Sequence, residues 1–142
     1  MNTTLFRAGL AAAALMIAAP AAFAETQTYK ATLTSAAQVP PNASKGTGTL
    51  ASTYDTATKK LTWTVTFSGL SGPATAAHFH GPAAAGANAG VVVPQKDGLT
   101  SPMKGEATLT DAQAADLQAG KWYFNIHTEA NKGGEIRGQA MK

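Results

Sequence analysis

Strict alternation of apolar and polar residues over residues 61–68 constrains the fold of this chain more than any other feature. Leu61, Trp63, Val65 and Phe67 alternate with threonine and serine. Successive side chains of a β-strand point to opposite faces, so this pattern predicts a strand with one buried and one solvated face. Half-buried strands are typical of antiparallel sheets, because parallel sheets are usually covered on both faces.

Glycine and proline divide the rest of the chain into segments of strand length. Further strands are expected over residues 28–34, 46–54, 74–80, 91–93, 103–109, 122–127 and 134–141. Residues 55–60 are expected to form a hairpin loop. One short helix is expected over residues 112–119, with Asp111 as its cap and Gly120 just past its end. Seven or eight short strands with one helix near 111–119 predict an all-β antiparallel sandwich or barrel.

The first 24 residues have the pattern of a secretory signal peptide. Arg7 precedes an apolar run over residues 8–19, and the sequence A-F-A at 22–24 has small residues where a signal peptidase cleaves. The apolar run is shorter than the roughly 20 residues that a membrane-spanning helix needs. We therefore expect cleavage after Ala24 and a mature domain of residues 25–142. That domain is expected to be periplasmic or secreted and to have no membrane span.

The composition excludes several classes of function. The chain of 142 residues has 11 Lys and Arg, 8 Asp and Glu, and no cysteine. Disulfides, thiolate metal sites and cysteine nucleophiles are therefore excluded. The basic residues do not cluster as nucleic-acid binding requires, so no nucleic-acid partner is expected. The sequence also lacks the G-x-S-x-G motif of serine hydrolases and a glycine-rich phosphate loop.

The three histidines of the chain fall in two of the predicted strands. His78 and His80 are two residues apart, so both point to one face, roughly 7 Å apart along the strand. His127 shares a strand face with Tyr123 and Asn125. If the two strands are neighbours, three imidazoles can meet around one metal ion. The alternative interpretation is that they are ordinary polar residues on the solvated face of a sheet.

The residue types around the histidines favour copper, with zinc as the alternative. Imidazoles without a thiolate suit either ion, and copper lies above zinc in the order of divalent affinities. Met103 or Met141 could add a thioether ligand for Cu(I), but both are better interpreted as core residues. Glu135 and Arg137 are interpreted as a solvated charge pair on one strand face. The polar residues that could orient the imidazole rings are Asn125, Glu129 and Glu135.

Three motifs, in order, resemble those of the CHRD domain, a family named from chordin. They are A-H-F-H-G-P at 77–82 with G-V-V-V at 90–93, L-Q-A-G-K-W-Y-F-N-I-H-T at 117–128, and G-G-E-I-R-G-Q at 133–139. The resemblance covers about residues 28–140. It implies an immunoglobulin-like or Cu,Zn-superoxide-dismutase-like sandwich, with His78, His80 and His127 as candidate metal ligands. It implies no single reaction, and it leaves open whether the loop over residues 81–90, expected to be mobile, covers the site.

Two functions follow as hypotheses. The first is an exported metal-binding domain that binds an ion, copper in preference to zinc, through His78, His80 and His127, for buffering, delivery or sensing of that ion. The second is an extracellular module that binds another exported protein and whose histidines are incidental. Catalysis is not expected, because a copper-only dismutase site needs a fourth imidazole that three histidines cannot supply; residual copper redox activity is left open.

Overall fold

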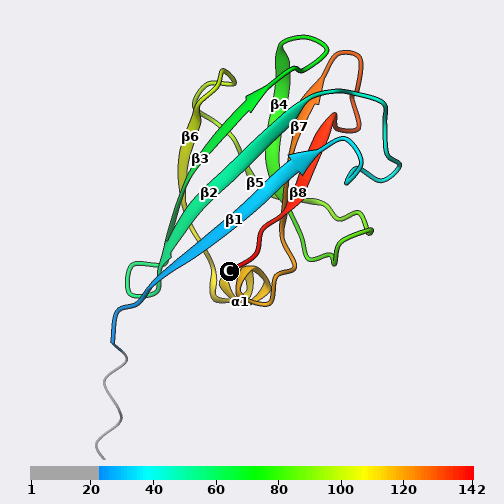
Figure 1. The fold of residues 1–142 in the computed structure, drawn as a ribbon. Coiled ribbons are helices and arrows are strands. Elements are labelled where there is room, and N and C mark those ends of the chain that lie inside the picture. The colour runs from blue at the N-terminus through cyan, green and yellow to red at the C-terminus, as the bar shows by residue number, and fades with distance from the viewer. Residues whose placement is uncertain (1–22) are drawn as a thin grey trace, which may run out of the picture.

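The computed structural model describes residues 23–142, which form one antiparallel sheet of eight strands and a single helix (Figure 1). The expected signal peptide therefore lies almost wholly outside the described residues. The elements in chain order are β1 (Thr26–Thr34), β2 (Thr47–Asp55), β3 (Lys60–Ser68), β4 (Ala74–His80), β5 (Val91–Pro94), β6 (Met103–Thr108), α1 (Asp111–Gln118), β7 (Tyr123–Thr128) and β8 (Ile136–Gln139). Within the sheet the strands follow the order β5-β4-β7-β8-β1-β2-β3-β6.

The sheet curls so that its two halves face each other across the core. Trp63 on β3 and Phe79 on β4 pack edge to face with ring centroids 5.2 Å apart, although four strands separate β3 from β4 in the sheet order. Phe79 also packs against Trp122 and Phe124. All four aromatic residues are buried, including Trp63, which the alternation over residues 61–68 placed on the buried face. The predicted all-β antiparallel fold is therefore confirmed.

Strands β1, β2 and β3 form a regular meander with the predicted alternation of faces. In β2, exposed and buried residues alternate along the strand, and it pairs with β1 and β3 along its whole length. The predicted hairpin between β2 and β3 is closed by Asp55, whose carboxylate accepts hydrogen bonds from the backbone N–H groups of Ala57 and Thr58. An aspartate that bonds the following backbone in this way stabilises a turn.

The helix begins one residue earlier than predicted, and its cap is Thr110 rather than Asp111. The Thr110 hydroxyl accepts from the backbone N–H of Gln113 at 3.1 Å, and the Gln113 side chain accepts from the backbone N–H of Thr110 at 3.0 Å. This reciprocal capping box satisfies two N–H groups that a helix start leaves free. Gly120 ends the helix with φ +70°, as predicted. Over residues 23–142, no helix has the length and hydrophobicity of a membrane span.

Candidate metal centre

The pairing of β4 with β7 brings the three histidines together on one face of the sheet. His78 lies opposite Asn125 in the register, and His80 lies opposite Tyr123. The predicted proximity of the two strands is therefore confirmed. One ring nitrogen from each histidine lies within 4.8 Å of the others. The group of His78, His80 and His127 could hold a metal ion, since three converging imidazoles are a common protein ligand set.

Backbone carbonyls fix the tautomer of two of these rings. His80 Nδ1 lies 2.9 Å from the carbonyl oxygen of Ala89, and His127 Nδ1 lies 2.8 Å from that of Lys132. A carbonyl oxygen can only accept, so each Nδ1 carries the proton of a neutral ring. The Nε2 atom of each ring is then left with a lone pair. This arrangement is how proteins orient metal-binding histidines through their second nitrogen.

The free nitrogens converge on one point beside Asn125. The Oδ1 atom of Asn125 lies 2.9 Å from His80 Nε2 and 3.0 Å from His127 Nε2. His78 Nδ1 lies 3.2 Å from His127 Nε2. With neutral rings, the lone pairs of two nitrogens face the Asn125 amide, which has an oxygen acceptor and an NH₂ donor group. A cation at this point would satisfy these groups together.

Burial keeps His78 and His80 in the form that binds metal. Burial lowers the pKa of His78, and the neighbouring rings of His127 and His80 lower it further because a second positive charge nearby is unfavourable. Burial also lowers the pKa of His80, in opposition to its hydrogen bonds with Ala89 and Asn125. Neutral imidazole is the ligand form, so a lowered pKa leaves these rings ready for an ion at neutral pH.

An aromatic stack joins His80 to the loop of residues 81–90. The rings of His80 and Tyr123 are nearly parallel, with centroids 4.8 Å apart, and the guanidinium carbon of Arg137 lies 3.4 Å from the Tyr123 centroid. Arg137 donates hydrogen bonds to the Asn88 side chain and to the carbonyl of Ala87. Its cationic plane on an aromatic ring is a stabilising cation–π contact.

The loop expected to be mobile is anchored over this part of the sheet. The backbone N–H of Ala89 donates to the Tyr123 hydroxyl at 3.1 Å, and the Ala89 carbonyl holds His80. Asn88 also donates to the carbonyl of Val39 on a separate loop. Residues 87–89 therefore cover the His80 side of the histidine group. The role of Ala89 has no local signal in the sequence, because this residue acts through its backbone.

The interpretation of Glu135 and Arg137 as a solvated charge pair is wrong. Both are buried, with exposed fractions of 0% and 2%, and they do not pair with each other. The Glu135 carboxylate accepts from the hydroxyls of Ser44, Ser71 and Thr128 and from the backbone N–H of Ser71. Burial alone would raise the pKa of Glu135, but these hydrogen bonds lower it to about 2.

The other polar and thioether candidates have separate positions. Of the three residues proposed to orient the rings, Asn125 does contact them, whereas Glu129 forms an exposed ion pair with Lys132. Met103 belongs to the core as predicted, whereas the Met141 side chain is exposed, so its interpretation as a core residue is wrong. Met103 pairs with Val65 on β3 and Met141 with Lys30 on β1, so neither lies on the strands that carry the histidines.

The comparison with protein families agrees with the motifs around this site. The family model of the CHRD domain matches residues 29–140. Searches of curated proteins and of solved structures each returned no match. The three motifs that carry the resemblance contain the histidines of β4 and β7 and the Glu135–Arg137 segment at β8. This chain belongs to the CHRD domain family.

Proposed function

We propose that this CHRD-domain protein is exported and binds a copper ion through His78, His80 and His127, to buffer, deliver or sense the ion. The observation that carries the proposal is the convergence of imidazole nitrogens whose lone pairs are fixed toward one point by Ala89 and Lys132. Copper is favoured over zinc by the divalent affinity order. Zinc is the alternative ion.

The hydrogen-bonding pattern supports a metal site over an incidental cluster. Two rings on an ordinary solvated face would be expected to point their Nε2 atoms at solvent. Here both Nε2 atoms lie within 3.0 Å of the same buried Asn125 amide and so can reach one shared ion. A proton could replace the ion, but burial lowers the pKa of His80 and opposes that. A metal cation therefore fits the arrangement best.

Export is the part of the proposal that depends on the sequence alone. The pattern of charge, apolar run and small residues before Glu25 supports removal of residues 1–24 and a periplasmic or secreted location. In such a compartment the mature domain of residues 25–142 would meet metal ions directly. Binding rather than catalysis is proposed, because three imidazoles on a sheet face, partly covered by a loop, suffice to hold an ion.

Metal titration of the mature domain tests this function. Calorimetric titration with Cu²⁺ and with Zn²⁺ at pH 7.5 should show one saturable site, tighter for copper. The variants His78→Ala and His127→Ala should lose this site, whereas Thr53→Ala, on a strand far along the sheet from β4, should retain it. Absence of saturable binding for both ions would overturn the proposal and leave the histidines incidental. Binding that survives both histidine substitutions would also contradict it.

A further inference from the structure

Resting on the proposed function, we propose that Asn125 supplies a fourth ligand through its side-chain oxygen and thereby makes the site select Cu(II) over Cu(I). Asn125 lies at the centre of the histidine group on β7 and is 3% exposed. Its oxygen is closer to two of the imidazole nitrogens than the nearest pair of imidazole nitrogens, at 3.2 Å, are to each other. The ligand set would be three nitrogens and one oxygen.

The distances fit a four-ligand site. Two ligand atoms that are 2.9–3.2 Å apart, each about 2.1 Å from a shared ion, subtend an angle of about 90–100° at that ion. This range lies between square-planar and tetrahedral geometry, both of which occur at copper. The ring nitrogens of the most widely spaced histidine pair lie within 4.8 Å of each other. Shifts of about half an ångström in each ring would bring both nitrogens close enough to bind one ion.

The position of the Asn125 amide is consistent with the same assignment. One end of the amide faces the imidazoles, and the other end borders the space beside Gly134, where a Cβ atom would crowd both Asn125 and the Gln38 side chain. Gln38 Nε2 is buried and has no hydrogen-bond partner.

The same side chain can serve the empty and the loaded site. Without an ion, the NH₂ group turned toward the imidazoles would donate to the two Nε2 atoms, and the oxygen would face the side on which the Gln38 donor lies. With an ion bound, the amide rotated by 180° would present its oxygen to the cation.

The chemical class of the ligand determines which ion gains from it. An amide oxygen is a hard ligand, which stabilises Cu(II) and contributes little to Cu(I), an ion that prefers soft sulfur ligands. The two candidate thioethers lie on other parts of the fold, Met103 opposite Val65 on β3 and Met141 opposite Lys30 on β1. Asn125 should therefore raise the affinity for Cu(II) much more than that for Cu(I).

The test compares both oxidation states in three variants of the mature domain. Cu(II) and anaerobic Cu(I) affinities are measured by competition with chelators for wild type, Asn125→Leu, Asn125→Asp and Gln38→Leu. Asn125→Leu should weaken Cu(II) binding by about 10- to 100-fold and Cu(I) binding by less than about threefold. Asn125→Asp, which keeps an oxygen and adds charge, should hold or raise Cu(II) affinity. Gln38→Leu, which removes the other amide beside Gly134, should leave the Cu(II) to Cu(I) ratio unchanged.

The results separate this inference from the proposed function. Wild type that binds neither ion would overturn both. Wild type that binds Cu(II), with an unchanged Cu(II) to Cu(I) ratio in Asn125→Leu, would overturn the inference alone. Equal losses for both ions leave this ratio unchanged, so they would overturn the inference and make Asn125 a positioning residue. If Asn125→Leu fails to fold, Asn125→Asp decides, because an unchanged Cu(II) electron paramagnetic resonance spectrum would show that no oxygen at this position binds the ion.

Discussion

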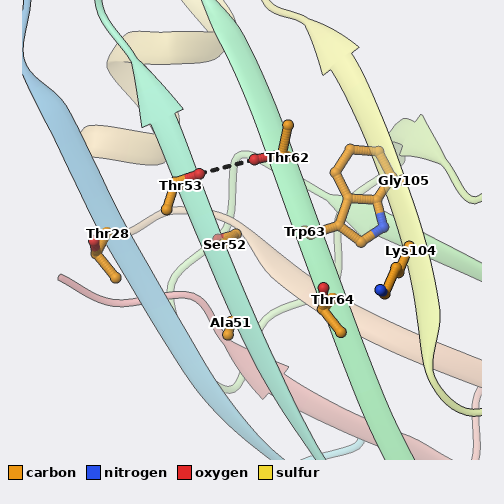
Figure 2. A pocket seen from close by; sticks show the side chains of 9 residues that line it. All are labelled: Thr28, Ala51, Ser52, Thr53, Thr62, Trp63, Thr64, Lys104 and Gly105. Carbon is orange, nitrogen blue, oxygen red and sulfur yellow. Dashed lines mark hydrogen bonds between the residues drawn. The ribbon is translucent and has the colours of Figure 1, made fainter.

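The outer faces of the two halves of the sheet differ in what covers them. On β1, β2 and β3 the outer side chains are mainly threonines in contact with solvent, with hydrogen-bonded pairs such as Thr53 and Thr62 at 2.8 Å (Figure 2). On β7 nearly every residue of both faces is buried. An exposed threonine is bonded by water, so its main requirement is an extended backbone, which threonine favours. A buried polar side chain must have a hydrogen-bond partner in the protein, so its position is fixed by particular neighbouring residues.

The covered half therefore concentrates the unusual polar residues of the chain. Asn125, Arg137 and Glu135 are buried there, together with His80. Burial of such groups costs free energy unless their hydrogen bonds are satisfied. The histidine group is thus built into the half of the sheet where polar residues are held by fixed contacts. The following predictions test this contrast.

The largest effect is expected at Glu135. Glu135→Leu leaves the hydroxyls of Ser44, Ser71 and Thr128 without their acceptor and should lower the free energy of unfolding by about 3 kcal/mol or more. Glu106→Leu is the matched control, because Glu106 lies on β6 in an exposed ion pair with Lys60. Loss of this ion pair should lower the free energy of unfolding by less than about 1 kcal/mol. Urea denaturation measures both, and equal effects would contradict the contrast.

The acid stability of the domain should show the same carboxylate. Because the pKa of Glu135 is lowered to about 2 in the folded state, its ionised form stabilises the fold above its ordinary pKa of about 4.3. This stabilisation is lost as the pH falls from about 4.3 toward 2. Urea midpoints of wild type and Glu135→Gln should therefore converge over this range. Midpoints that stay parallel down to pH 2 would show that the carboxylate is not held ionised.

A smaller effect is expected at the stack that anchors the loop. Arg137→Lys removes the planar guanidinium that lies on the Tyr123 ring and its two hydrogen bonds to Ala87 and Asn88. This substitution should lower the free energy of unfolding by about 1–2 kcal/mol. Hydrogen exchange at the amide of Ala89 should accelerate. Lys104→Arg, at an exposed position on β6, provides the control. Unchanged exchange at Ala89 would mean that Arg137 does not hold the loop.

Metal affinity should depend on pH with a definite sign. Protons compete for the same lone pairs, so affinity falls as the pH drops. Because burial lowers the pKa values of His78 and His80, most of the fall should occur below the ordinary histidine pKa of about 6.5. Zinc titrations between pH 7.5 and pH 5 measure it, with a loss of about tenfold expected. Constant affinity over that range would mean that other groups bind the ion.

The smallest effect is expected on the threonine face. Thr53→Val breaks the hydrogen bond to Thr62 but retains a β-branched side chain in an exposed strand position. The free energy of unfolding should change by less than about 0.5 kcal/mol, and copper affinity should be unchanged. Thermal unfolding and metal titration check both values. A loss of copper binding would contradict the separation of the two halves.

Local patterns predicted the strands well, because they depend on side-chain alternation and on glycine and proline. The bounds of β3 and β4 follow directly from such patterns. The helix cap is also encoded locally, since T-x-x-Q at 110–113 is a capping-box pattern, but the next residue, Asp111, is of a type that caps helices equally well and so conceals the true start. Short-range signals of this kind involve residues within four positions of each other.

Long-range contacts were not accessible in the same way. The hydroxyls around Glu135 include Ser71 and Ser44, which are 64 and 91 positions away along the chain. An acidic residue after two glycines resembles an exposed one until those loops are placed around it. The meeting of the histidines could be proposed from strand faces, but the partner of β4 in the sheet had to be assumed. The Ala89 carbonyl gave no side-chain signal at all.

The most direct test of the central claim identifies which ring nitrogens bind the ion. In the ¹⁵N-labelled mature domain loaded with Zn²⁺, the histidine side-chain resonances should show metal coordination at Nδ1 of His78 and at Nε2 of His80 and His127. The Nδ1 atoms of His80 and His127 should remain protonated and bonded to their carbonyls. Rings whose nitrogen resonances do not change on addition of zinc, or coordination through Nδ1 of His127, would contradict the account.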